Sequence, residues 1–393
     1  MKDHFHDPLL KTPFHDRTSA ACKLNQWGAW AGYTTPIAYC DEAMEYTAIR
    51  NAASLYDLCP MIKYRISGPD SGAYLNRLTL RDAAKLPVGA VHYTAWTDDE
   101  GKLLDDGTLF RLGGEDYRLC CQERHLPWLL DSSLSYDVQL FEETSQIASL
   151  ALQGPTSAAI LRIAGFDITA LRPFRMAGFP FRSDKLLISR TGFTADLGYE
   201  LWISPDLALP LWDMLMQAGA LHGLRPIGSN ALNVARIEAG FIIANMDFIP
   251  TEQTVRPDRS RSPYELGLDW MIDWTKGQFT GRQALARERD QKSSRWALVA
   301  LDIQGNVSAE GSLIYENKTR EVGYITAAAW SPTTKRNIAL AQVTRSLANS
   351  RSLWVEIYAL RELQYHKLMV KADVTARPFF SPPRRRATPP LDF

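Results

Sequence analysis

At its centre the chain reads Leu186-Leu-Ile-Ser-Arg-Thr-Gly-Phe-Thr-Ala-Asp-Leu-Gly-Tyr-Glu-Leu-Trp-Ile203, which predicts two short strands joined by a turn. Both strands are mainly apolar, and the polar, glycine-containing residues 191–198 predict the turn. Glu200 interrupts the second strand on the same side as Trp202. A carboxylate there needs a partner, either an arginine guanidinium or the amino-pyrimidinone edge of a pterin or purine, because its two oxygens accept parallel N–H bonds.

A second carboxylate interrupts the strand predicted over Leu104 to Leu112. Strand alternation places Asp106 on the same face as Leu104 and Phe110, and directs Asp105 outward. A buried carboxylate loses hydration, so its pKa tends upward unless it meets a donor or a cation. Asp106 is therefore either a reactive group or a structural aspartate bonded to backbone amides.

Arg236 is the third ionisable residue predicted to face inward. A helix is expected from Asn230 to about Ala244, on which Leu232, Arg236 and Ile243 share one face. This pattern projects Arg236 from an apolar stripe. The structural alternative is an ion pair among Arg236, Glu200 and Glu238.

The chain as a whole has a mixed α+β pattern. Strand Ile62 to Ile66 precedes helix Ser71 to Leu78, and Gly154-Pro155-Thr156 opens a further helix. From near residue 288 alternating strands suggest a separate β-rich domain, plausibly a small barrel. The polar loop Pro250 to Pro263 is long enough to suggest function, and the Pro/Arg-rich end is expected to be extended.

Composition excludes several classes of protein. The 393 residues carry 44 Lys+Arg and 44 Asp+Glu, so no basic excess points to nucleic acid. The apolar runs are too short for a membrane span, and Met1 to His15 lacks a signal-peptide pattern. The five cysteines have no CxxC spacing, and the histidines have no metal-ligand spacing, which predicts a cytoplasmic protein with reduced thiols and no metal.

Seven motifs occur in the order found in the glycine-cleavage T-protein (aminomethyltransferase) superfamily, which the sequence resembles from about Thr12 to Phe380. They are Gly101-Lys-Leu-Leu-Asp-Asp106, Leu152-Gln-Gly-Pro-Thr156, Ser189-Arg-Thr-Gly-Phe-Thr-Ala-Asp-Leu-Gly-Tyr-Glu200, Ala235-Arg-Ile-Glu-Ala-Gly240, Glu265-Leu-Gly-Leu-Asp-Trp270, Phe279-Thr-Gly-Arg-Gln-Ala-Leu285 and Ser331-Pro-Thr333. The ordered series is specific, whereas any one motif alone is weak.

The resemblance implies a three-domain cloverleaf around a central tetrahydrofolate pocket. The first domain would comprise residues 1–52 and 149–247, and the second, folate-binding and catalytic, residues 53–148 and 248–287. A β-barrel-like domain would follow over 288–380, with a Pro/Arg tail over 381–393.

The resemblance also assigns roles to single residues. Asp106 matches the catalytic aspartate, Glu200 the pterin-binding glutamate and Arg236 a folate-contacting arginine. Tyr93 falls at a pocket tyrosine, and Arg384 near a C-terminal folate contact.

Departures from the family pattern affect the expected substrate. Pro60 stands where T-proteins typically carry a histidine, Ala195-Asp196 replaces Gly-Glu, and residues 27–36 are rewritten. These changes argue against a lipoyl carrier protein as donor and favour a tetrahydrofolate-dependent demethylase that moves a methyl group from a small N-, O- or S-methylated metabolite to N5. The alternatives are an aminomethyltransferase that forms 5,10-methylenetetrahydrofolate, or a folate-binding regulator without turnover.

A methylated onium donor would need an aromatic cage, because aromatic faces attract such cations. The residues from which such a cage could be built are Trp27, Trp30, Tyr33, Trp96 and Trp270.

Overall fold

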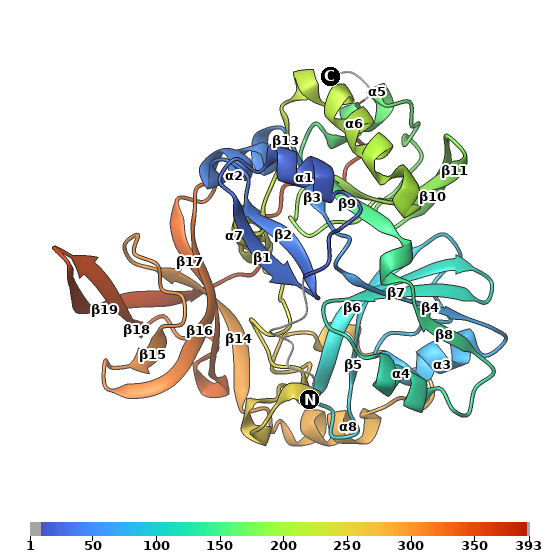
Figure 1. Ribbon diagram of the computed structural model, residues 1–393. Coiled ribbons are helices and arrows are strands. Elements are labelled where there is room, and N and C mark those ends of the chain that lie inside the picture. The colour runs from blue at the N-terminus through green and yellow to red at the C-terminus, as the bar shows by residue number, and fades with distance from the viewer. Residues whose placement is uncertain (1–8, 391–393) are drawn as a thin grey trace.

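The computed structural model describes residues 9–390, so Met1 to Pro8, over which the absence of a signal peptide was inferred, lie outside the described residues together with 391–393. The chain forms three structural units around the centre of the molecule: a six-stranded sheet with its helices, a five-stranded sheet with its helices, and a barrel (Figure 1). The expected α+β class is confirmed. No helix within residues 9–390 is long and apolar enough to cross a membrane.

The six-stranded sheet has the order β10-β11-β12-β9-β3-β13 and is antiparallel except for the β13–β3 pair. Its strands are β3 (Ala53–Asp57), β9 (Ala148–Gln153), β10 (Met176–Phe181), β11 (Asp184–Ser189), β12 (Gly198–Ile203) and β13 (Leu224–Pro226). Its helices are α1 (His15–Ala21), α2 (Glu42–Asn51), α5 (Ser157–Ile163), α6 (Ala208–Ala218) and α7 (Ser229–Ala239). The strand–turn–strand prediction for residues 186–203 therefore corresponds to β11 and β12.

The five-stranded sheet has the order β5-β6-β7-β4-β8. Its strands are β4 (Ile62–Ser67), β5 (Val91–Thr97), β6 (Leu103–Gly113), β7 (Asp116–Cys121) and β8 (Gln139–Glu142), and its helices are α3 (Ser71–Leu78) and α4 (Leu126–Ser132). One expected boundary differs from this arrangement. Residues 53–57 were expected in the second domain. They form β3, which pairs with β9 in the six-stranded sheet, and this pairing with a distant strand could not be predicted from neighbours in the sequence.

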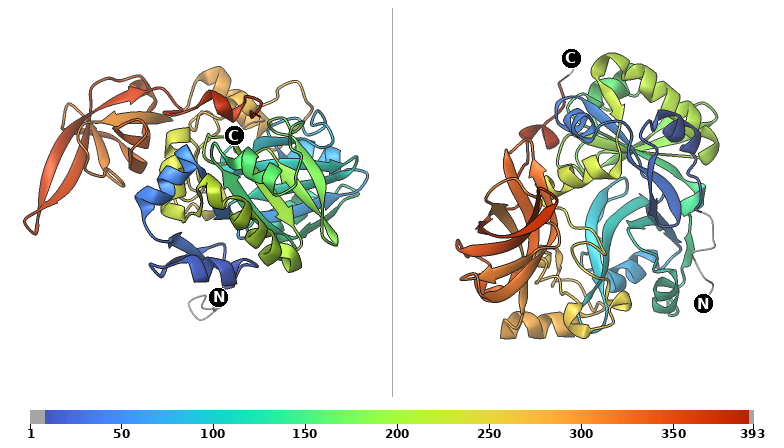
Figure 2. Two further views of the ribbon diagram at one scale, coloured as in Figure 1. Left: turned by 90° about the horizontal axis from the view of Figure 1, so that it is seen from above. Right: turned by 60° about the vertical axis from the view of Figure 1, so that its left-hand side comes forward.

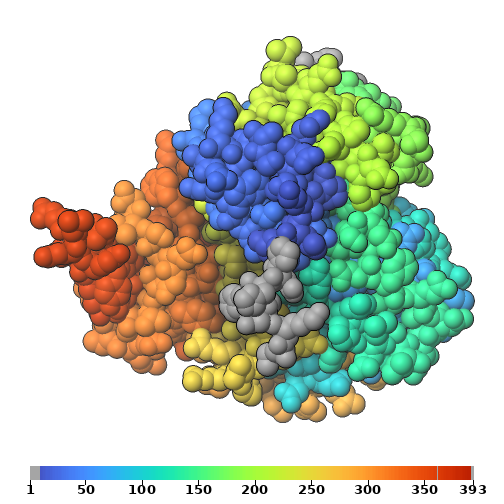
Figure 3. Space-filling model, viewed as in Figure 1, coloured from blue at the N-terminus to red at the C-terminus, as the bar shows by residue number. Residues whose placement is uncertain are grey.

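The C-terminal strands close into a six-stranded barrel of order β14-β17-β16-β15-β18-β19. Its strands are β14 (Trp296–Ile303), β15 (Leu313–Glu316), β16 (Arg320–Ser331), β17 (Arg336–Thr344), β18 (Leu353–Arg361) and β19 (Gln364–Thr375). The expected boundary at residue 288 falls inside α8 (Arg282–Gln291), which leads into β14. The predicted barrel is confirmed, and the β18–β19 hairpin projects from it (Figures 1 and 3).

Helix α7 is shorter than predicted. It ends at Ala239 because Gly240 adopts φ +70°, a left-handed conformation that terminates the helix. Ile243 therefore lies beyond the helix. The expected helical face that includes Arg236 does not extend to Ile243. Arg236 is nevertheless fully buried.

The two ends of the described chain pack onto the bodies. Residues 26–38 form a hairpin of β1 (Gln26–Trp30) and β2 (Tyr33–Ala38) that local patterning did not predict. The C-terminal segment crosses back to the six-stranded body (Figure 2), where Arg190 donates a hydrogen bond of 2.5 Å to the carbonyl of Ala387. The expectation of an extended end is therefore only partly correct for residues 381–390, because Pro383–Arg385 form a 3₁₀ turn and the segment contacts the six-stranded body, although most of its residues are exposed.

Candidate active site

The two sheets meet through one apolar cluster. Phe110 on β6 and Trp202 on β12 contact each other edge to face, with ring centroids 5.1 Å apart, and Val91 and Cys120 complete the buried contact. Alternation places Asp106 on the same face of β6 as Phe110, and Glu200 on the same side of β12 as Trp202. Both carboxylates therefore point to the side on which the sheets face each other.

Asp106 is partly exposed and is held by the neighbouring strand. Its Oδ2 accepts a 2.6 Å hydrogen bond from the Tyr93 hydroxyl on β5. Burial and the charge of Asp106 raise the pKa of Tyr93 well above its usual value, so the hydroxyl keeps its proton and donates. The predicted inward facing of Asp106 agrees with the structure.

The outward facing expected for Asp105 is wrong, because this carboxylate has no exposed surface. It points to the opposite face of β6, which is covered by α3, α4 and the apolar cluster beneath them. This sheet is covered on both faces, so side chains that alternate along β6 point to one buried environment or to the other. Its Oδ1 accepts the backbone N–H of Asp106 at 2.8 Å.

The pKa of Asp106 lies far above that of an ordinary aspartate. Burial is the main cause, and the negative charges of Asp105 and then Asp247 add to it, while the bond from Tyr93 acts in the opposite direction. Asp106 thus retains a proton to higher pH than usual and can exchange it near neutrality, which is the property required of a general acid or base.

Glu200 has no cationic partner among the described residues. Its Oε2 accepts a 2.5 Å hydrogen bond from Thr191, and burial raises its pKa to about 7 although that bond opposes the change. The structural alternative, an ion pair with Arg236, is not realised. The carboxylate keeps acceptor capacity for a ligand with paired N–H donors.

Arg236 is closed off from ligands in this structure. It is fully buried, and its Nη1 donates to Asp247 at 2.5 Å while its Nε donates to Asn233 at 2.8 Å. Asp247 in turn accepts the hydroxyl of Thr326 on β16. Arg236 thus forms a buried ion pair with Asp247, an acidic partner beyond the end of α7 that sequence periodicity could not reveal.

Arg377 is a second arginine near Tyr93 and Asp247, and the sequence reasoning missed it. Its Nη1 is buried without a hydrogen-bond partner among the described residues, and its positive charge acts on Tyr93 and Asp247. Gly240 and Gly267 make room for it, since a Cβ on Gly240 would lie 2.3 Å from Arg377 Cγ. In the sequence Arg377 appears only as an isolated basic residue shortly after β19, and such a residue is too common to indicate a functional role.

Family models match both parts of the chain. The GCVT N-terminal domain matches residues 14–276, and the glycine cleavage T-protein C-terminal barrel domain matches residues 297–381. The chain belongs to the glycine cleavage T-protein family. This family comprises tetrahydrofolate-dependent one-carbon transferases, as the resemblance in sequence implied.

Curated relatives and a solved structure agree with membership of the T-protein family. An aminomethyltransferase of Halothermothrix orenii is 31% identical over 342 residues, covering 85% of this chain and 92% of that protein. A trimethylamine-oxide aldolase of Ruegeria pomeroyi is 33% identical over 350 residues, covering 85% of this chain but 43% of that protein. The crystal structure of aminomethyltransferase T from Bartonella henselae shares the fold, with a TM-score of 0.83 at 23% identity over 95% of this chain and 98% of that chain.

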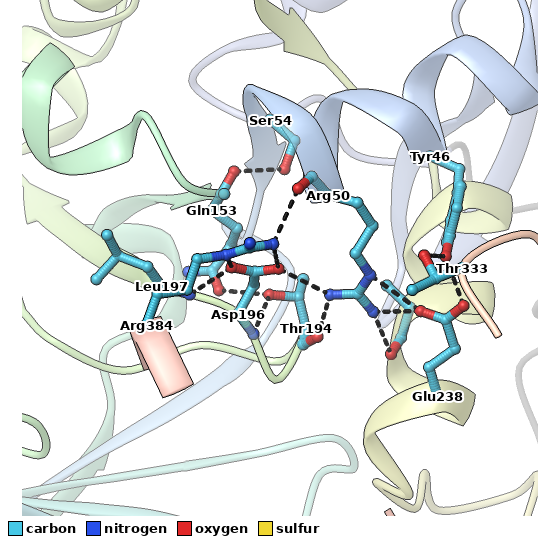
Figure 4. Close-up of polar contacts among 12 residues, drawn as sticks. Tyr46, Arg50, Ser54, Gln153, Thr194, Asp196, Leu197, Glu238, Thr333 and Arg384 are labelled. Atoms are coloured by element: carbon cyan, nitrogen blue, oxygen red, sulfur yellow. Dashed lines mark hydrogen bonds and ion pairs between the residues drawn. The ribbon is translucent and has the colours of Figure 1, made fainter. Parts of the chain in front are cut away.

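One departure from the T-protein pattern has a structural explanation. Asp196, in the Ala195-Asp196 pair, is buried and accepts a two-pronged hydrogen bond from Arg384 at 2.6 and 2.8 Å (Figure 4). It also accepts from Arg50, which reaches across to Glu238 at 2.5 Å. Asp196 therefore joins the tail to the six-stranded body. Arg384, expected near a folate contact, has its guanidinium engaged here.

The aromatic candidates separate into different environments. Trp96 is fully buried with its ring 5.7 Å from His125, so its expected place in a substrate cage is wrong. Trp27 packs on His15 and Trp30 on Tyr56, whereas Tyr33, the first residue of β2, is buried.

Trp270 is the aromatic candidate that lies beside Tyr93. It is 62% exposed, and its ring centroid lies 6.4 Å from that of Tyr93. A groove of about 670 Å³ opens beside it, lined also by Arg81, His92 and Arg175. Within residues 9–390, no three His, Cys, Asp or Glu side chains gather as a metal site would require.

Proposed function

We propose that the protein transfers a one-carbon unit from an aminomethyl donor to tetrahydrofolate, bound between the two sheets, to form 5,10-methylenetetrahydrofolate. The observation that carries this proposal is the pair Asp106 and Glu200, which lie on the sides of β6 and β12 that meet in the Phe110–Trp202 contact and which have no cationic partner among the described residues. The similarity to curated aminomethyltransferases supports this reading over the methyl transfer that the sequence favoured.

The residues present fit a reduced pterin. Glu200 offers two acceptor oxygens to the paired N–H donors of the pterin edge, and the unpartnered Nη1 of Arg377 offers a donor to an oxygen of the same ligand. Tetrahydrofolate, when bound, supplies the nitrogen nucleophiles that receive the carbon.

Asp106 is the residue placed to handle the proton of the reaction. Its raised pKa lets it hold a proton for a leaving amine and release it again near neutral pH. Tyr93 fixes the orientation of its Oδ2, and a fixed carboxyl beside two bound reactants gains from positioning.

The proposal is tested by product identity. The full chain is incubated with tetrahydrofolate and, separately, with an aminomethylated lipoyl carrier protein, small methylated amines, sulfonium compounds and methoxyaromatics. We expect 5,10-methylenetetrahydrofolate from an aminomethyl donor, as detected by mass spectrometry. Formation of 5-methyltetrahydrofolate instead would overturn the proposal, and folate binding without product across the panel would favour a regulator.

A second candidate is transfer of a methyl group to N5 from a small metabolite. It is favoured by Pro60, which is buried in the turn between β3 and β4, where T-proteins typically present a histidine. The turn is held from inside by Lys63, whose Nζ donates to the carbonyls of Cys59 and Met61 at 2.9 and 2.8 Å. The same product assay separates this candidate from the first.

Binding of tetrahydrofolate should depend on the ionisation of Glu200. Because burial raises its pKa to about 7, the carboxylate form that accepts two N–H bonds is populated above this pH and is lost as the pH falls through it. We expect calorimetry to show affinity that decreases from pH 8 to pH 6. In Glu200→Gln the affinity should fall about 10- to 100-fold at pH 8, as expected for loss of charge-assisted bonds, and this pH dependence should disappear. Unchanged affinity in the variant would remove Glu200 from the site.

A further inference from the structure

Three ionisable side chains run in a row from behind Asp106 to the surface. Asp105 Oδ2 lies 3.1 Å from His125 Nε2, and His125 Nδ1 lies 2.9 Å from Glu252 Oε2. The side chains of Asp105 and His125 are 0% and 1% exposed, whereas that of Glu252 is 36% exposed. We call Asp105, His125 and Glu252 the charge row.

The charge row joins three separate parts of the chain. Asp105 lies on β6, His125 directly precedes α4, and Glu252 lies in a short 3₁₀ turn (Thr251–Gln253) within the polar loop that the sequence marked as unusual. The His125 backbone N–H donates to the Tyr64 hydroxyl at 2.8 Å, and its ring meets Trp96 edge to face at 90°. The imidazole is therefore fixed from several sides.

The geometry determines the charge of His125. A neutral imidazole has one donor and one acceptor nitrogen, so one of its nitrogens would face a carboxylate oxygen with its lone pair. The imidazolium alone donates to both carboxylates. Burial lowers the pKa of His125, but the bonds to Asp105 and Glu252 raise it to about 9.

The carboxyl of Asp105 has several hydrogen-bond partners. Besides His125 it accepts the backbone N–H groups of Asp106 at 2.8 Å and Glu123 at 3.0 Å. Among the described residues, Tyr93 on β5, Cys121 on β7 and Asp247 beyond α7 also face this carboxyl pair. Two cations lie behind them, since Arg236 pairs with Asp247 and the charge of Arg377 acts on Tyr93 and Asp247.

We propose that His125 is a positioning residue whose imidazolium, held by Glu252, balances the charge of Asp105 and so weakens the repulsion between Asp105 and the neighbouring carboxyl of Asp106. The role of Asp106 as the reacting group rests on the proposed function. The balance of charge within the row rests on the distances and burial given above.

The first test removes the positive charge. In His125→Gln the carboxyls of Asp105 and Asp106 lose the nearby cation, so it becomes harder for both of them to be ionised at once. The higher of the two apparent pKa values of this pair should therefore rise by about one unit. Carbon-13 NMR of the full chain labelled at aspartate, without folate or donor, measures this titration, and Asp106→Asn assigns the signals. His92→Gln is the matched control, since His92 is also buried but its Nε2 has no hydrogen-bond partner among the described residues. An unchanged upper titration in folded His125→Gln overturns the proposal.

A second variant decides the question if His125→Gln does not fold. Glu252 lies at the surface, so Glu252→Gln should fold, and loss of its charge should lower the pKa of His125 by about one unit. Nitrogen-15 NMR should show both ring nitrogens of His125 protonated at pH 7.5 in the unmodified chain. A neutral His125 at that pH, or an unshifted His125 in Glu252→Gln, overturns the proposal. Because these spectra need no turnover, failure of the transfer assay would overturn the proposed function and leave the charge row standing.

Discussion

The Asp106→Asn variant is expected to lose about 10²- to 10⁴-fold in turnover, the range attributable to a positioned proton donor or acceptor. Asparagine keeps the shape of the side chain and can still accept the hydrogen bond from Tyr93 through its amide oxygen, but it cannot hold or release a proton. Tetrahydrofolate affinity should remain within about tenfold, because the pterin is assigned to Glu200 and not to Asp106. Single-turnover kinetics with separate calorimetry of folate binding check both expectations.

The matched control for this variant is Asp116→Asn. Asp116 lies on the adjacent strand of the same sheet and pairs with Arg65 at a partly exposed position, away from the space between the sheets. Its turnover should equal that of the unmodified chain. An active Asp106→Asn protein would remove Asp106 from the mechanism, and with it the reaction we propose.

The Arg236→Met variant is expected to lose about 3–5 kcal/mol of the free energy of unfolding, the cost of leaving a buried charge without its partner. Both side chains of the Arg236–Asp247 pair are completely buried, and methionine would leave Asp247 with the Thr326 hydroxyl and the Ile243 amide only. Urea denaturation of the full chain, followed by tryptophan fluorescence, measures the change.

Arg17→Met is the control for a surface ion pair. Arg17 meets Asp213 with both side chains about half exposed, where solvent screens the interaction, so its unfolding curve should stay close to that of the unmodified chain. If Arg236→Met were as stable as this control but bound tetrahydrofolate much more weakly, Arg236 would be a ligand contact and not the structural pair described here.

The sequence correctly predicted those helices and strands that are determined by residues close to one another in the chain. Helix α3 was predicted over Ser71–Leu78 and has these bounds in the structure, and strand β4, predicted over Ile62 to Ile66, extends one residue further to Ser67. Strand alternation also directed Asp106 and Glu200 inward, because one apolar face suffices to orient a strand. The C-terminal barrel followed from a series of such strands.

Long-range packing accounts for what the sequence could not predict. The burial of Asp105 depends on the layer of α3 and α4 behind the sheet, and the partner of Arg236 lies beyond the end of α7. Arg377 and the docked tail likewise depend on contacts between distant segments, such as the 188 residues that separate Arg384 from Asp196.

The sequence by itself determined which residues alternate along each strand, where several helices begin, and which T-protein motifs occur and in what order. These features depend on backbone geometry and on neighbours in the chain, so they can be read locally. Only the tertiary structure decided which carboxylates have a charge partner, because the cost of burying a charge depends on every group that surrounds it. Asp105 meets the His125 imidazole there, whereas among the described residues Asp106 and Glu200 have no cationic partner. This difference in environment distinguishes the chemistry of the three carboxyl groups.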